Sequence, residues 1–194
     1  MIVGIGHGYL KMTQLKSVRF FPEWNEIYPY SVIGFLEFIN YILSIQPTID
    51  NWIEIGSHLG ESSTLVLGFP QIKKLHCIEA SQESCEILQQ KFSKDIQKSR
   101  CSIIHEISDI AERHFINESV DVVYIDANHS FESVSKDIEN YYHKVKSCGF
   151  FAGHDYSNAW PGVKEAVNNF IINYGYSPKD LIVFSDSSWL FRKK

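Results

Sequence analysis

The sequence predicts an α/β fold in which a doubly wound, mostly parallel sheet carries helices on both faces. Short apolar runs alternate with longer amphipathic stretches between residues 51 and 173, and this alternation is typical of parallel sheets. A glycine-rich turn follows the first apolar run. Two further apolar runs, 181–184 and 189–191, flank a polar turn and break the alternation. They predict an antiparallel hairpin at the end of the sheet.

The first expected element is a helix that Ser31 caps and that runs to about residue 45, because apolar residues repeat there at helical spacing. Strands are expected at 51–55, 75–79, 101–105, 120–126 and 149–154. Helices are expected near 60–68, 82–92, 109–115, 130–146 and 161–173. Ser130 can cap the helix that follows it. Pro161 suits a first helical turn, and Gly175 can end the last helix.

Length and composition predict a single globular domain. The chain has 194 residues, of which 44% are hydrophobic and 21% charged, as is usual for such domains. We expect one domain over residues 1–194, in which residues 1–48 form an extension and a helix beside a core at about 50–194. The formal charge is −5 and the basic residues do not cluster except at 192–194, which argues against nucleic acid as a partner.

The sequence also favours a cytoplasmic protein without a membrane partner. It has no apolar stretch long enough to cross a bilayer, and its first residues lack the pattern of a signal peptide. Its four cysteines form no C-x-x-C pair. Reduced and mostly buried thiols are therefore expected.

The glycine-rich turn lies in the stretch "NWIEIGSHLGES", residues 51–62. Ligands of doubly wound sheets bind beyond the carboxyl ends of the strands, next to such a turn. Here Glu54 would repel a pyrophosphate, and His58 stands where the middle glycine of G-x-G-x-x-G would be. The turn also lacks the lysine of a phosphate-binding loop. S-adenosylmethionine fits this turn, because its sulfonium and ammonium groups are cationic.

A second acidic residue, Glu79, ends the next expected strand, about 25 residues after Glu54. A carboxylate in that place can accept hydrogen bonds from both hydroxyls of a ribose. Its position would suit a nicotinamide dinucleotide equally well. The two acids together, without a phosphate site, favour the methyl donor.

These motifs resemble the class I S-adenosylmethionine-dependent methyltransferases over residues 50–172. "WIEIGSHLGES" resembles their first motif, "CIEA" their ribose-binding acid and "HEISDIAE" their adenine-side loop. The stretch 120–170 is similar to the family 24-type group, with D-x-x-H-S near its start, then G-x-x-x-x-H-D-Y and a P-G-V-K helix.

The resemblance implies a Rossmann-like, seven-stranded sheet in the order 3-2-1-4-5-7-6. It also implies that S-adenosylmethionine binds to a set of residues along the carboxyl ends of the strands: Glu54, Gly56, Ser57, His58, Gly60, Ser62, Glu79, Ala80, Ser108, Asp109 and Asp126. From its sequence position, Asp109 would serve equally well as the N-cap of a helix beginning at residue 110.

The candidate chemical centre is formed by Asp126, at the end of the fourth strand, and Asp155, after the fifth. In the implied strand order these strands are neighbours, so about 5 Å separates their backbones. With His129 and His154 nearby, the two carboxylates could hold a divalent cation, Mg or Mn. The resemblance to catechol-type O-methyltransferases supports this interpretation, since they carry acids at corresponding positions.

One ligand position departs from the catechol-type pattern. Tyr156 stands where those enzymes have an asparagine, so the third ligand is open between His129, His154 and Asn158. Without a cation, His129 or His154 would be the general base, because a neutral imidazole titrates near physiological pH.

The leading hypothesis is therefore methyl transfer from S-adenosylmethionine to a hydroxyl of a small molecule, a sugar or a phenol. One alternative is a nicotinamide-dependent oxidoreductase or epimerase on a similar sheet, and another is a protein that binds S-adenosylmethionine without turning it over. The acceptor, including whether oxygen, nitrogen or carbon is methylated, is not specified by the sequence. A homodimer formed through the N-terminal helices is a further expectation.

Overall fold

The computed structural model describes residues 29–194. The extension expected before the first helix lies outside the described residues. No helix in the described part of the chain is long and apolar enough to cross a membrane. All four cysteines are free, and three of them are buried.

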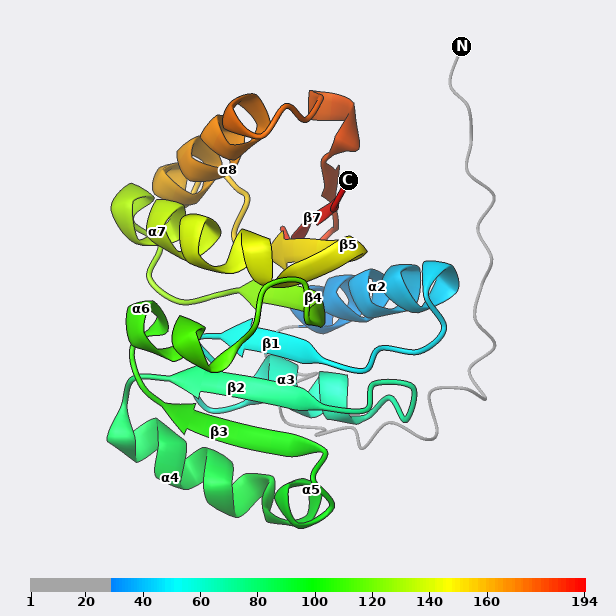
Figure 1. Ribbon diagram of the computed structural model, residues 1–194, viewed down its shortest axis with the longest axis vertical. Helices are drawn as coiled ribbons and strands as arrows, with labels where there is room; N and C mark the ends of the chain where they lie inside the picture. The colour runs from blue at the N-terminus through cyan, green and yellow to red at the C-terminus, as the bar shows by residue number, and fades with distance from the viewer. Residues whose placement is uncertain (1–28) are drawn as a thin grey trace.

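The sheet confirms the order implied by the resemblance. It has seven strands in the order β3-β2-β1-β4-β5-β7-β6, and Figure 1 shows β3, β2, β1, β4 and β5 side by side from bottom to top. Five strands are parallel: β1 (Trp52–Ile55), β2 (Leu75–Glu79), β3 (Cys101–His105), β4 (Val120–Ile125) and β5 (Val145–Gly153). The hairpin of β6 (Ile182–Val183) and β7 (Trp189–Arg192) completes it, with β7 antiparallel to β5.

Helices cover both faces of the sheet, as expected. On one face, α2 (Pro29–Ile45), α3 (Glu61–Leu67) and α4 (Gln82–Lys91) share an apolar core with inward residues of the strands. On the other face lie α6 (Ser108–Ala111), α7 (Phe131–Tyr141) and α8 (Pro161–Asn173). Short elements connect them: α5 (Ser93–Gln97), η2 (Glu112–His114), η3 (Tyr142–Lys144) and η4 (Pro178–Asp180).

The two cores follow from alternation along the buried strands. In β1, Trp52 belongs to the core under α2, while Ile53 and Ile55 belong to the core under α7. In β4, Tyr124 faces α2, and the rings of Phe35 and Phe38 pack against it with centroids 5.2 and 5.3 Å away. Because successive side chains of a strand point to opposite faces, each central strand serves both cores.

Several expected boundaries are confirmed and others are wrong. Ser130 caps α7 by accepting a hydrogen bond from the Ser133 N–H, and Pro161 begins α8. Ser31, in contrast, is not a cap: α2 begins two residues earlier at Pro29, whose fixed φ suits a first turn. Asp109 is not an N-cap either, because it lies inside α6.

The expected strand at 149–154 was too short. The observed β5 begins at Val145, where it pairs with Val120 before the register shifts. The polar residues Lys146 and Ser147 interrupt the apolar pattern in this irregular part of the strand, and Cys148 beside them has a φ of 63°. The helix α5 was not expected, and it has no buried residue that would produce an apolar period.

Candidate active site

A cleft of about 820 Å³ opens beyond the carboxyl ends of β1, β2 and β4. β1 pairs with β2 on one side and β4 on the other, so the chain leaves these strand ends in different directions and the space between them is free. Residues from the glycine turn, from the ends of β2 and β4, and from α2 and the β6–β7 turn line the cleft.

The glycine turn after β1 is held close to the neighbouring strand. Gly56 has a φ of 87°, and a Cβ atom there would meet the Asp126 carbonyl oxygen at 2.2 Å. Gly60 also has a positive φ, precedes the first residue of α3, and donates its N–H to the Ser57 carbonyl at 2.7 Å. Both glycines are therefore required by backbone geometry, and the turn aims the start of α3 at the cleft.

Glu54 lies beneath this turn rather than in the cleft. It is fully buried, and its carboxylate accepts hydrogen bonds from the hydroxyls of Ser57, at 2.8 Å, and Ser63. Burial raises the pKa of Glu54 above the usual value, although these hydroxyls oppose the shift. Glu54 therefore fixes the turn from below. Ser63, which the sequence did not single out, belongs to this arrangement.

Glu79, at the end of β2, does line the cleft. Its carboxylate accepts the backbone N–H of His58 at 2.8 Å and that of Ser81 at 2.8 Å. These bonds hold His58 at a φ of 45°, which an ordinary side chain rarely adopts. The carboxylate is thus fixed by two backbone donors and retains free lone pairs for the hydroxyls of a ribose.

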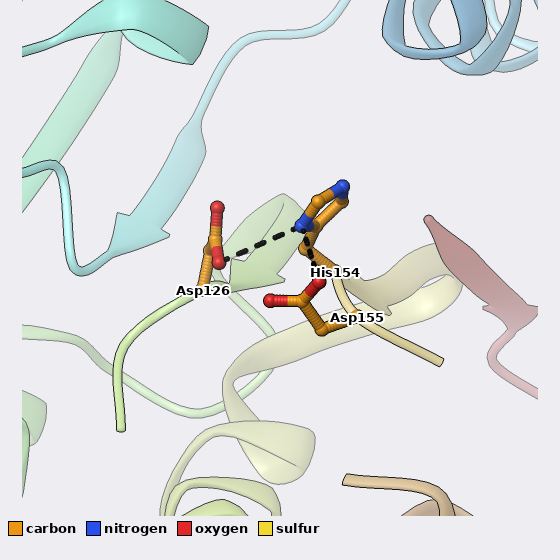
Figure 2. A group of neighbouring side chains, drawn as sticks. All are labelled: Asp126, His154 and Asp155. Atoms are coloured by element: carbon orange, nitrogen blue, oxygen red, sulfur yellow. Dashed lines mark ion pairs between the residues drawn. The ribbon is translucent and has the colours of Figure 1, made fainter. Parts of the chain in front are cut away.

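Asp126, His154 and Asp155 converge at the other end of the cleft. Asp126 follows β4, while His154 and Asp155 follow β5, and one ligand atom from each lies within 4.8 Å of the others. Figure 2 shows both carboxylates facing one nitrogen of the His154 ring: Nδ1 lies 3.3 Å from Asp155 Oδ1 and 3.9 Å from Asp126 Oδ1. Asp155 has a φ of 62°. Positive φ is uncommon outside glycine and more often tolerated by aspartate.

His129 approaches the same carboxylates from the loop before α7. Its Nε2 lies 2.7 Å from Asp155 Oδ2 and 3.8 Å from Asp126 Oδ1, and its ring stacks on Trp160 with centroids 4.2 Å apart. The short contact lacks hydrogen-bond geometry, so Nε2 has no hydrogen-bond partner. The two predicted histidines and two predicted carboxylates therefore form one cluster of opposite charges.

The electrostatics of the cluster favour charged side chains. Burial alone would lower the pKa of His154, but its bond to Asp155 and the charges of Asp126, Asp155 and Asp186 raise that pKa to about 9. The carboxylates of Asp126 and Asp155 also raise the pKa of His129. Burial would raise the pKa of Asp155, but the two histidines outweigh burial and hold it below the usual value.

Comparisons with known proteins assign the chain to a family. The sequence profile of a family described as a methyltransferase domain matches residues 53–156, more than half of the chain. The chain belongs to this family. The matched range runs from β1 to the loop after β5, so it contains the glycine turn, Glu79 and the Asp126–His154–Asp155 cluster. Membership confirms the resemblance to the class I methyltransferases, a group that implies S-adenosylmethionine as methyl donor.

Solved structures of low identity support the fold of this methyltransferase family. The O-methyltransferase NovP is 14% identical, with 84% of this chain and 80% of that chain covered and a TM-score of 0.68. A protein of Methanococcus maripaludis, provisionally described as an S-adenosyl-L-methionine-dependent methyltransferase, is 16% identical, with 98% of both chains covered and a TM-score of 0.63.

The spermidine synthase of Thermotoga maritima shares the fold as well. It is 18% identical, with 79% of this chain covered and a TM-score of 0.54, and the present chain spans 56% of its length. No match was found among curated proteins. At these identities the solved structures establish the fold, and the acceptor must be inferred from the site.

The structure places most of the residues that the resemblance implied for the cofactor along the cleft. The cleft is lined by Gly56, Ser57, His58, Ser62, Glu79, Ala80, Ser108 and Asp126. Gly60, within the turn, and Glu54, beneath it, are not among the lining residues. Asp109 points to α7, where its carboxylate accepts a hydrogen bond from the Asn140 amide at 2.8 Å. A cofactor role for Asp109 therefore stays a prediction without support from its position.

Two residues considered near the cation lie elsewhere. Asn158 is exposed and accepts a hydrogen bond from Lys164 at 2.8 Å, outside the cluster. Tyr156, in the position of the expected asparagine ligand, donates its hydroxyl to Asn168 at 2.9 Å. The structure thus favours His154 as the third member of the cluster.

Sequence reasoning missed Asp186, in the turn between β6 and β7. Its carboxylate Oδ2 lies 3.9 Å from His154 Nε2, and the residue lines the cleft. Nothing in the sequence near residue 186 indicates this contact. It depends on the pairing of Gly153 with Trp189, which brings the hairpin turn to the end of β5.

Proposed function

We propose that the protein transfers a methyl group from S-adenosylmethionine to a hydroxyl of a small molecule, with a divalent cation held by Asp126, Asp155 and His154. The observation that carries this proposal is the convergence of three ligand atoms within 4.8 Å at the end of the cleft that contains the glycine turn and Glu79. Such an arrangement would hold a methyl donor and an acceptor in one cavity, and placement of this kind supplies much of the rate of a displacement reaction.

The charge of the cleft supports a cationic cofactor. Its lining contains five acidic side chains, Glu61, Glu79, Glu106, Asp126 and Asp186, and among the described residues that line it there is no lysine or arginine. A dinucleotide carries a pyrophosphate and would meet repulsion here, whereas the sulfonium and ammonium groups of S-adenosylmethionine would not. This favours the methyltransferase over the nicotinamide-dependent alternative.

The residues of the cluster fit a divalent cation. Two carboxylates and one imidazole suit Mn or Mg better than they suit a thiophilic metal. When bound, such a cation supplies Lewis acidity that lowers the pKa of an acceptor hydroxyl. The chain itself orients the acceptor: Phe35 and Tyr124 form an aromatic wall beside Asp126 and His154.

The histidines are poor general bases in this arrangement. With a pKa of about 9, His154 is protonated at neutral pH and cannot accept a proton from the acceptor. Asp126 and Asp155 also raise the pKa of His129, which favours its protonated form. A cation would displace the proton from His154 and take over the neutralisation of Asp126 and Asp155. The cation-assisted reaction is therefore preferred to catalysis by a histidine alone.

Removal of the cation tests this proposal. Protein treated with EDTA should lose transfer of a labelled methyl group to phenol and sugar acceptors, and Mn²⁺ should restore it. Because Mn²⁺ competes with the His154 proton, the half-saturating Mn²⁺ concentration should rise by up to about tenfold for each unit by which the pH is lowered below 9.

The control for this experiment is EDTA that already carries an equal amount of Mn²⁺, which should leave the activity intact. Full transfer to a hydroxyl by the metal-depleted protein would contradict the role of the cation. Transfer to amines alone would contradict the hydroxyl acceptor while leaving the methyltransferase assignment in place.

A further inference from the structure

The turn between β6 and β7 places a buried carboxylate on the far side of the His154 ring. In Figure 2 the second ring nitrogen points away from Asp126 and Asp155. This atom, Nε2, lies 3.9 Å from Asp186 Oδ2, and the Asp186 side chain is only 1% exposed. The ring therefore lies between two groups of acceptors, with Nδ1 facing the cluster and Nε2 facing the hairpin.

The Asp186 carboxylate is itself fixed. Its Oδ1 accepts the Ser188 N–H at 3.0 Å, and its Oδ2 accepts the Ser188 hydroxyl at 2.7 Å. The Ser188 hydroxyl also lies 2.9 Å from the Tyr124 hydroxyl, which comes from β4 in the centre of the sheet. Two bonds in the turn and a link to the sheet thus set the position of the carboxylate.

The same hairpin holds the backbone on either side of the cluster. The Trp189 indole N–H donates to the His154 carbonyl at 3.1 Å, and the Tyr156 N–H donates to the Ser187 carbonyl at 3.0 Å. These bonds fix the residues before and after Asp155, whose positive φ needs such support. The hairpin therefore positions both the ring and the main chain of the segment 154–156.

Helix α2 packs tightly against this turn. A Cβ atom at Gly34 would meet the Asp186 nitrogen at 2.4 Å, the Asp186 Cβ at 2.6 Å and the Ser185 hydroxyl at 2.8 Å. Gly34 lies inside a helix and has no positive φ, so its backbone would accept alanine. The close approach of the β6–β7 turn explains why residue 34 is a glycine, and a larger residue there would displace Asp186.

We propose that Asp186 is a positioning residue, which holds His154 Nε2 so that Nδ1 is presented to the cation site formed with Asp126 and Asp155. This positioning role rests on the proposed function in one respect, namely that a cation binds to Asp126, Asp155 and His154. Metal-binding histidines usually direct their other ring nitrogen to a carboxylate or carbonyl, which fixes the ring and raises ligand basicity. At 3.9 Å the carboxylate acts through its charge rather than through a direct hydrogen bond.

The alternative is that Asp186 only shapes the turn. The substitution Asp186→Asn separates the two roles, because the asparagine oxygen can still accept the Ser188 N–H and its amide can donate to the Ser188 hydroxyl oxygen, while the negative charge is lost. Ser185→Ala is the matched control: it lies in the same turn, is exposed and bonds Glu37 rather than the cluster. Gly34→Ala is a second variant that displaces the turn without changing any group in the cleft.

Two measurements decide between these roles. In crystals grown without metal, the wild type and Ser185→Ala should keep His154 Nδ1 near Asp155, whereas Asp186→Asn and Gly34→Ala should show the ring rotated or shifted. In Mn²⁺ titrations followed by electron paramagnetic resonance, Asp186→Asn and Gly34→Ala should bind Mn²⁺ about 10- to 100-fold more weakly than the wild type. Thermal melts of all variants should show cooperative unfolding and so report an intact fold.

An unchanged His154 ring in the Asp186→Asn crystals would overturn the positioning role, and so would wild-type affinity for Mn²⁺ in that variant. A wild-type protein that binds no Mn²⁺ would overturn the cation in the proposed function. In that case the orientation of the ring in the metal-free crystals still decides the role of Asp186, so the two failures are distinguishable.

Discussion

Replacing Asp126 and Asp155 together with asparagine is expected to lower the rate of methyl transfer by roughly 10³-fold or more, because several kcal/mol of Lewis-acid stabilisation depend on these carboxylates. Stability should change little. Both side chains are partly exposed, at 30% and 16%, and the histidines are their cluster partners, so we expect a change of about 1 kcal/mol in the free energy of unfolding. Steady-state rates and thermal melts of the variant and the wild type measure the two effects.

Asp109→Asn is the matched control for this variant, since that carboxylate bonds Asn140 outside the cleft. It should keep the wild-type rate. Unchanged activity in the Asp126→Asn, Asp155→Asn variant would remove these residues from the reaction. A protein that fails to melt cooperatively would instead show that the cluster maintains the ends of β4 and β5.

Gly56→Ala is expected to weaken cofactor binding strongly. The added Cβ would meet the Asp126 carbonyl at 2.2 Å and the Ala127 Cα at 2.7 Å, and the φ of 87° is strained for any side chain. The strain alone costs about 1–3 kcal/mol, and relief of the clash must separate the turn from β4. We expect calorimetric titration with S-adenosylhomocysteine to show affinity at least about 100-fold weaker than that of the wild type, a loss of about 2.7 kcal/mol.

Gly175→Ala is a control that carries the same backbone strain without the clash. Its φ is 68°, and no atom lies within 4 Å of the added Cβ. This variant should lose stability but bind S-adenosylhomocysteine as the wild type does. Equal affinities in Gly56→Ala and Gly175→Ala would show that the turn after β1 does not need its close approach to β4.

The fold was predictable because its determinants are local. Apolar runs of strand length separated by amphipathic helices specify a doubly wound sheet, and the sequence placed β2, β3 and α8 at the observed residues. Where the local pattern is broken the predictions failed. The start of β5 contains Cys148 in a positive-φ conformation, and α2 begins at Pro29 rather than after Ser31.

The site was predictable only where its residues end a strand or belong to the glycine turn. Glu79, Asp126 and His154 follow this rule, and parallel neighbours bring them to one edge of the sheet. The complete burial of the Glu54 side chain was not predictable, because it depends on how α3 packs over β1. Asp186 was not predictable either, since its contact with His154 depends on the register between β5 and β7.

The central claim is that the cleft binds S-adenosylmethionine beside a cation site, and calorimetric titration with S-adenosylhomocysteine tests it most directly. The titration should be done on EDTA-treated protein, alone and with Mn²⁺. We predict micromolar binding in both cases, with an altered enthalpy or affinity when Mn²⁺ is present. Binding that is identical with and without Mn²⁺ would contradict the cation site. No binding under either condition would contradict the assignment of Glu79 and the glycine turn to the methyl donor.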